Sequence, residues 1–126
     1  MSTVTLIIWG LLFATLAYFA WNYFAFKRMA QQIDNDTFKE MMHKSQIIDL
    51  RDPAAFRNKH ILGARNFPLQ TFDASIKSLR KDKPILVYEN ATSRIAPSAL
   101  KKLKKAGFTD LYLLRDGIDY WDGKTK

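Results

Sequence analysis

The residues best placed to do chemistry form one stretch that joins a predicted strand to a predicted helix. Residues 84–88 are a short and mainly aliphatic run, which predicts a strand buried on both faces of a parallel sheet. In open α/β sheets, ligands bind at such junctions because backbone N–H groups and the positive end of the helix converge there. We therefore predict an anion-binding loop at this point. Its residues are Glu89, Asn90, Ala91, Thr92, Ser93 and Arg94.

The other elements are predicted from apolar spacing. After the loop, apolar residues recur every three or four positions as far as Gly107, which is suited to ending a helix. Four short strands alternating with helices predict an α/β fold, with a parallel sheet flanked by helices on both faces. The remaining strands are expected at 46–50, 65–67 and 111–114, and the remaining helices after the capping candidates at 34–37, at 53–56 and at 71–80.

Four motifs follow one another along residues 33–121. They are Asp49-x-Arg51, His60-Ile-x-Gly-Ala-x-Asn-x-Pro68, Lys105-Ala-Gly-Phe and Gly117-x-x-x-Trp121. In this order they resemble the motifs of the rhodanese-like domains. The resemblance implies the rhodanese-like fold, with the 89–94 loop at the active site and Asp49, Arg51 and His60 as candidate pocket neighbours. Because Lys59 stands where the family has a glycine before this histidine, a purely structural role for His60 also stays open.

The same resemblance argues against sulfur transfer. Rhodanese sulfurtransferases carry a cysteine at the first loop position, which accepts a sulfane sulfur as a persulfide and passes it to an acceptor. That position is Glu89 here, and the chain contains no cysteine. A carboxylate cannot form a persulfide. The loop has the length found in sulfurtransferases, although Thr92 and Ile95 stand where many members have Gly and Ser.

Two placements of the Glu89 side chain stay open. Its carboxylate either occupies the anion cradle of the loop, stabilised by the helix N-terminus and Arg94, or points to solvent beside a vestigial pocket. The functional alternatives are a non-catalytic binding module and an enzyme that uses Glu89 in acid–base chemistry beside His60. No second carboxylate lies in the loop, and no metal-ligand spacing is present, so we expect the binding module, without a metal or other cofactor.

Residues 4–26 contain no charged side chain. At about 1.5 Å per residue, a helix of this length exceeds the roughly 30 Å hydrocarbon core of a bilayer. The alternatives are a cleaved signal peptide, for which the basic start and the small-residue cleavage site are lacking, and a buried soluble helix. We expect a transmembrane anchor over residues 1–28 and a rhodanese-like domain over residues 29–126.

Charge predicts the orientation and the surface partners. All 20 Lys and Arg follow residue 26, beginning with Lys27-Arg28, so we expect a single-pass protein of the cell membrane with its C-terminal domain in the cytoplasm. The net charge is +8, and its densest run lies opposite the apolar stripe of the last helix. This run forms either a solvated face or a surface for anionic lipid or an unknown protein partner. Nucleic acid is not expected, because no recognition motif accompanies the charge. The run consists of Lys101, Lys102, Lys104 and Lys105.

Overall fold

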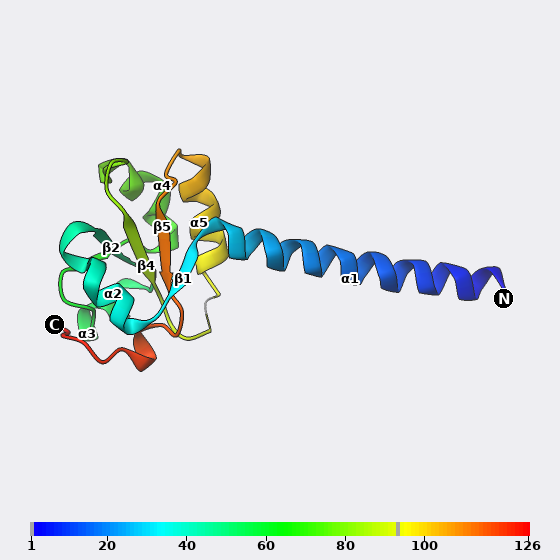
Figure 1. The fold of residues 1–126 in the computed structure, drawn as a ribbon, viewed down its shortest axis with the longest axis horizontal. Helices are drawn as coiled ribbons and strands as arrows, with labels where there is room; N and C mark the ends of the chain where they lie inside the picture. The colour runs from blue at the N-terminus through cyan, green and yellow to red at the C-terminus, as the bar shows by residue number, and fades with distance from the viewer. Residues whose placement is uncertain (1, 93) are drawn as a thin grey trace.

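A computed structural model describes residues 2–92 and 94–126, and it has a central five-stranded sheet (Figure 1). All paired strands are parallel, in the order β1-β5-β4-β2-β3, which confirms the predicted sheet type. The strand that precedes the candidate loop, β4, lies between β5 and β2. The strands are β1 (Gln31–Ile33), β2 (Gln46–Asp49), β3 (Arg65–Asn66), β4 (Ile85–Tyr88) and β5 (Leu111–Leu114).

Helices cover both faces of this sheet. Two of them begin as the sequence predicts, because Asp34 Oδ1 accepts a hydrogen bond from Thr37 N (2.8 Å) and Asp52 Oδ1 accepts one from Ala55 N (2.9 Å). Gly107 ends α5 with a φ of 99°, in the left-handed region that favours glycine. The α-helices are α1 (Thr3–Met29), α2 (Asn35–Met41), α3 (Pro53–Asn58), α4 (Phe72–Ser75) and α5 (Ala96–Lys105).

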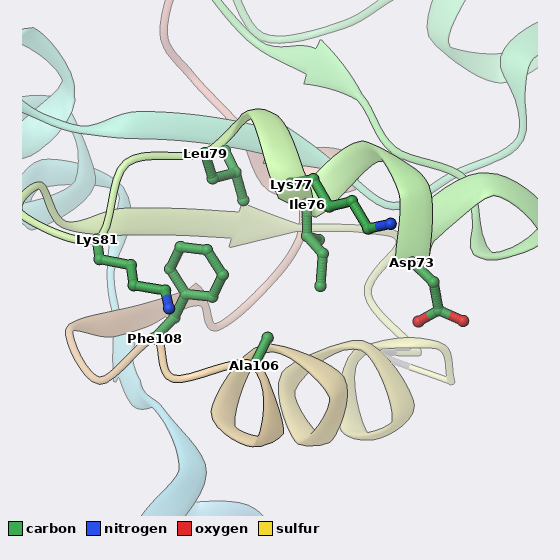
Figure 2. Close-up of a pocket in the computed structure, with 7 residues that line it drawn as sticks. All are labelled: Asp73, Ile76, Lys77, Leu79, Lys81, Ala106 and Phe108. Atoms are coloured by element: carbon green, nitrogen blue, oxygen red, sulfur yellow. The ribbon is translucent and has the colours of Figure 1, made fainter.

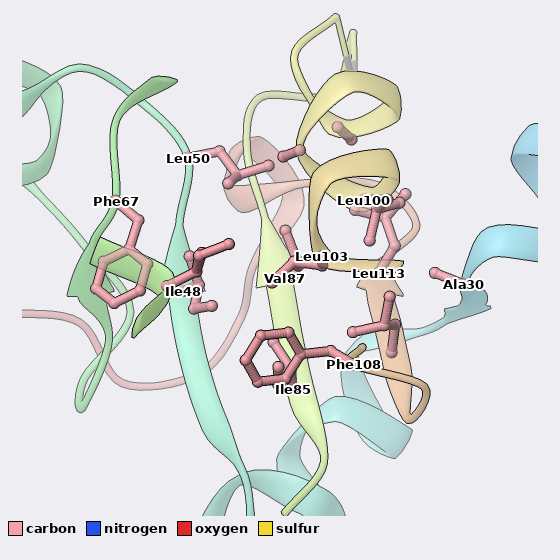
Figure 3. Packing of buried hydrophobic residues seen from close by; sticks show 14 of the residues in the cluster. Ala30, Ile48, Leu50, Phe67, Ile85, Val87, Leu100, Leu103, Phe108 and Leu113 are labelled. Atoms are coloured by element: carbon pink, nitrogen blue, oxygen red, sulfur yellow. The ribbon is translucent and has the colours of Figure 1, made fainter. Parts of the chain in front are cut away.

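The sheet separates two hydrophobic cores. The first, the α5-side core, packs Ile48 and Val87 of the sheet against α5 and the α4 segment (Figure 3). The second, the α2-side core, contains Tyr88 together with Phe38 and Trp121. Because successive side chains of a strand point to opposite faces, neighbours such as Val87 and Tyr88 belong to different cores. This alternation decides which helix each side chain near the loop can reach.

Strand β1 is missing from the sequence prediction, which has four strands and no element between the expected anchor and the helix after residues 34–37. The structure pairs Gln31 with Tyr112 and Ile33 with Leu114 at the edge of the sheet. A three-residue strand that contains two glutamines has no period of its own. Its pairing with β5 comes from residues 81 positions away, which local pattern cannot reveal.

The predicted helix over residues 71–80 is also corrected. This segment consists of a 3₁₀ turn (Leu69–Thr71), α4 and a second 3₁₀ turn (Ile76–Ser78). The hydroxyl of Ser78 donates to the carbonyl oxygen of Ser75 (2.8 Å), and such local side-chain bonds compete with a regular helix. The segment nevertheless packs on the sheet, since Phe72 and Ile76 are buried in the α5-side core.

The N-terminal helix α1 extends away from the domain (Figure 1). Its Thr3–Ala25 segment has a mean hydropathy of 1.9, and none of it is buried against the rest of the chain. By length and composition it is a candidate membrane span. Directly after α1, Ala30 is buried in the α5-side core and β1 begins at Gln31, so little free chain separates the helix from the domain.

Candidate functional site

Glu89 follows β4 directly, and its side chain is directed into the protein. Glu89 is only 3 % exposed. Its carboxylate accepts hydrogen bonds from Ile95 N (2.9 Å to Oε1 and 3.1 Å to Oε2) and from Ala96 N (2.6 Å to Oε1). These are the first N–H groups of α5, whose cap position is occupied by Ile95, a residue without a capping side chain. Glu89 therefore caps α5. Of the two placements left open by the sequence, its carboxylate takes the one at the helix N-terminus rather than the one in solvent.

The electrostatics of Glu89 are dominated by burial. Burial raises the pKa of the Glu89 carboxyl group above its ordinary value of 4.5, the N–H bonds of Ala96 and Ile95 oppose this rise, and the negative charge of Asp49 adds to it. The net direction is upward. Glu89 is thus a carboxylate for which the donors of the helix end compensate only part of the cost of leaving water.

This direction predicts how stability depends on pH. A carboxyl group with a raised folded-state pKa stabilises the fold most below its unfolded pKa, and the contribution is lost as pH rises through the folded pKa. Glu89→Gln keeps an oxygen acceptor but cannot ionise. We expect the variant to gain stability relative to wild type as the pH rises above the ordinary carboxyl pKa, as measured by urea unfolding. An NMR titration that finds an ordinary or lowered pKa for Glu89, with parallel stability curves, would contradict this.

The first half of the loop is held by the turn after β5. Ile118 N donates to the carbonyl oxygen of Glu89 (3.0 Å), and Ala91 N donates to Asp119 Oδ2 (3.0 Å). Gly117 makes the close approach possible, because a Cβ atom at this position would lie 2.6 Å from the carbonyl oxygen of Glu89. Asp119 is a residue that positions the loop and that the sequence prediction missed. It lies within the closing motif, but only its contact with Ala91 reveals a role.

The remaining loop residues lie at the surface. Asn90, Ala91, Thr92 and Arg94 are exposed, and Ser93 lies outside the described residues. The expected support of Glu89 by Arg94 is wrong, since no ion pair within residues 2–92 and 94–126 joins the two side chains. The physical reason is that the two side chains point in different directions. The Glu89 carboxylate points inward to α5, whereas Arg94 is exposed to solvent.

Asp49 and Arg51 lie together in the interior, on the other face of the sheet. Asp49 is fully buried. Its carboxylate accepts bonds from Arg51 N (2.8 Å to Oδ1), Arg51 Nε (3.1 Å to Oδ1) and Arg51 Nη2 (2.7 Å to Oδ2). The guanidinium group also donates to the carbonyl oxygen of Lys59 and lies 5.9 Å from the ring centre of Tyr88. Asp49 affects Glu89 through its charge, and Asp49 and Arg51 form a buried hydrogen-bonded network with the Lys59 carbonyl oxygen.

The contacts that the structure shows for His60 are structural ones. Its ring stacks on Phe56 with centroids 3.8 Å apart, and Nδ1 lies 2.7 Å from the carbonyl oxygen of Phe56. Since a carbonyl oxygen can only accept, Nδ1 carries the proton in this arrangement. The backbone of His60 also pairs with Lys126 in both directions. Among the residues that the structure describes, no hydrogen bond connects the His60 ring to the loop.

A separate cavity of about 370 Å³ lies between the α4 segment and the C-terminal end of α5 (Figure 2). Ile76, Leu79 and Phe108 supply its apolar lining, and Lys77 and Lys81 line it as well. The ten residues of α5 span about 15 Å, and Glu89 caps the opposite end of this helix. The cavity is therefore distinct from the loop. Across the described part of the chain, no group of three or more His, Asp or Glu side chains could hold a metal ion.

Comparisons with known proteins agree on one family. The sequence model of the rhodanese-like domain family matches residues 34–124 of this chain. An uncharacterized protein of Bacillus subtilis, YqhL, is 34 % identical over 125 residues, which cover 99 % of this chain and 96 % of that protein. The thiosulfate sulfurtransferase GlpE of Stutzerimonas stutzeri is 34 % identical over 77 residues, covering 60 % of this chain and 68 % of that protein.

Solved structures give the same result. The rhodanese-like domain of the Alr3790 protein from Anabaena is 27 % identical with a TM-score of 0.66, covering 75 % of this chain and 77 % of that one. The BH2092 protein from Bacillus halodurans has a TM-score of 0.70, with 87 % and 85 % coverage, and at 24 % identity it supports the fold alone. The chain belongs to the rhodanese-like domain family.

Proposed function

We propose that this protein is a membrane-anchored rhodanese-like module without sulfurtransferase activity, which binds a protein partner at the cytoplasmic face of the membrane. One observation carries the proposal. The residue at the position of the family's cysteine, Glu89, directs its carboxylate onto the N–H groups at the start of α5. The chain supplies no cysteine that could replace the missing nucleophile.

The loop donors are already bonded within the chain. Ile95 N and Ala96 N donate to Glu89, and Ala91 N donates to Asp119. An external thiosulfate or phosphate would have to displace a covalently tethered carboxylate and would meet its negative charge. This arrangement supports a role of the loop as a fixed binding surface, and it argues against a role in which the loop repeatedly binds and releases anions.

The geometry gives less support to acid–base catalysis by Glu89. A general acid or base must lie within hydrogen-bond reach of the proton that it transfers. Glu89 is almost fully buried, its carboxylate is bonded to the backbone of α5, and the His60 ring bonds to Phe56 instead of the loop. This alternative would be favoured if the wild-type protein catalysed an acid–base reaction and Glu89→Gln lost that activity while keeping its fold.

Exchange of the nucleophile tests the main proposal. In Glu89→Cys, the N–H groups of Ile95 and Ala96 lose their carboxylate, and a thiol at a helix N-terminus has a lowered pKa. The thiolate is expected to attack the outer sulfur of thiosulfate, forming a persulfide and releasing sulfite. Mass spectrometry should detect the added sulfur in Glu89→Cys, but not in wild type or in the Glu89→Ser control. Thiosulfate turnover by wild type would overturn the proposal.

The membrane orientation is tested separately by single cysteines, since the wild-type chain contains none. In intact cells, Lys126→Cys should react with a membrane-impermeant thiol reagent only after permeabilisation. Ser2→Cys should react before it. The reverse pattern would place the domain outside the cytoplasm.

A further inference from the structure

The way in which α1 joins the domain decides which side of the domain faces a membrane. Ala30, the first residue after α1, is buried in the α5-side core, and α1 contacts α5. Figure 1 shows α1 leaving the domain on the side that α5 covers, whereas α2 and α3 lie on the far side of the sheet. When α1 spans a bilayer, the outer face of α5 is therefore turned towards the membrane.

The distance between the domain and the bilayer follows from the length of α1. The apolar segment ends at Ala25, and the helix continues to Met29. Four residues correspond to about 6 Å of helix, and the headgroup layer on each side of the hydrocarbon core is roughly 5–8 Å thick. The domain thus begins at the outer edge of the headgroups. Charges on its membrane-facing side act on the lipid surface over a Debye length of about 8 Å.

The outer face of α5 is polar and positively charged. Spacing of three and four places Ser98, Lys101 and Lys105 on one stripe of the helix, and all three are exposed. Lys104 is exposed beside this stripe. Within residues 2–92 and 94–126, these three lysines take part in no ion pair. The opposite face of α5 is buried and consists of Ala96, Ala99, Leu100 and Leu103.

Positive charge is concentrated on this side of the sheet. Residues 72–83 and α5, which cover it, contain eight Lys and Arg but two Asp, so they carry a net charge of +6 out of the +8 of the whole chain. Both aspartates are paired within these segments, Asp73 with Lys102 and Asp82 with Arg80. An anionic surface that approaches the two segments therefore meets lysines without meeting an unpaired carboxylate.

We infer that the outer face of α5 docks on the anionic surface of the membrane leaflet beside it, through Lys101, Lys104 and Lys105. The attraction is between charged surfaces and requires no pocket. The inference rests on the anchor proposed above and adds a fixed orientation of the domain to it. In this orientation, the side of the sheet that carries α2 and α3 is turned away from the membrane, where a protein partner can reach it.

The orientation can be tested with the full-length protein in nanodiscs of phosphatidylcholine, with and without phosphatidylglycerol. Since the chain contains no cysteine, a single fluorophore can be attached to Ser98→Cys on α5 or to Asn58→Cys on α3. Lipids that carry a nitroxide on the headgroup quench a fluorophore close to the bilayer surface. We expect quenching at position 98, stronger with phosphatidylglycerol than without it, and none at position 58.

Charge variants test the contribution of the lysines. The populations of quenched and unquenched fluorophore at position 98 give the ratio of docked to undocked domain. Lys101→Gln combined with Lys105→Gln is expected to lower this ratio with phosphatidylglycerol by about fivefold for each lysine, about 25-fold together. Lys44→Gln combined with Lys59→Gln is the matched control, with the same charge change at exposed positions after α2 and α3, and should dock like wild type.

Three results would overturn the inference. These are equal quenching at position 98 in the two lipid compositions, stronger quenching at position 58 than at position 98, and equal losses in the two double variants. Carbonate extraction of membranes separates this failure from failure of the anchor. A chain that is extracted has lost both proposals, whereas an embedded chain without a preference for phosphatidylglycerol has lost only this one.

Discussion

Replacing Asp49 by alanine is expected to lower the free energy of unfolding by about 3–5 kcal/mol, the usual cost of breaking a buried ion pair from one side. The carboxylate of Asp49 is fully buried, and the side chain of its partner Arg51 is only 11 % exposed. Removal of the carboxylate leaves the guanidinium group with the Lys59 carbonyl oxygen, close to the face of Tyr88, and without a counter-charge. The backbone N–H of Arg51 loses its acceptor as well.

The free energy can be measured by pulse proteolysis of the full-length protein in detergent across a urea series. Asp82→Ala is the control, because it removes an aspartate from an ion pair with Arg80 in which both side chains are more than half exposed. Screening by water makes such pairs weak, so this variant should unfold like wild type. Equal stability losses in Asp49→Ala and Asp82→Ala would contradict the prediction, because they would show that loss of the buried Asp49–Arg51 pair costs no more than loss of an exposed ion pair.

Replacing Gly117 by alanine is expected to displace the candidate loop and to destabilise the domain. Gly117 has a φ of 73° and a ψ of −179°, a region that is essentially restricted to glycine and costs other residues about 1–3 kcal/mol. The added Cβ would lie 2.6 Å from the oxygen of Glu89, 2.7 Å from the carbonyl carbon of Asn90 and 2.8 Å from Ala91 N. These are backbone atoms, so the clash is relieved only by moving the loop.

Gly63→Ala provides the matched control for this variant. Gly63 also has a positive φ, of 90°, but its nearest neighbour would be Ile47 Cδ1 at 3.9 Å, an ordinary contact. The control therefore carries the backbone strain without the clash. Amide chemical shifts of Ala91 and Ile118 should change strongly in Gly117→Ala and little in Gly63→Ala. Similar shifts and similar unfolding energies in both variants would mean that the close approach of Gly117 does not position the loop.

Together, Glu89 and Gly117 explain why this loop differs from a cradle for a free anion. Glu89 supplies the helix cap from within the loop, and Gly117 allows the turn after β5 to approach the backbone on the other side. The loop is thus held from two directions by its own chain. Asn90, Thr92 and Arg94 are exposed on this loop, whereas the Glu89 side chain is buried.

The sequence alone determined the fold class and the lack of a cysteine in the loop. Periodic apolar residues identified β4 and α5, the capping residue Asp34 identified the start of α2, and Gly107 identified the end of α5. The absence of cysteine and the position of Glu89 raised the question of activity without any coordinates. These are local signals, since each depends on side-chain type or on spacing within a few residues.

The tertiary structure decided the contacts between distant parts of the chain. It paired β1 with β5, turned Glu89 towards α5 and His60 towards Phe56, and bonded Asp119 to Ala91. It also placed Lys102 and Lys104 in different surroundings. Lys102 pairs with Asp73, whereas Lys104 borders a small pocket together with Gln31 of β1. The physical reason is the same in each case. A rotamer or an edge pairing is chosen by neighbours that only folding brings together, whereas a helix period or a cap is already present in the local order of residues.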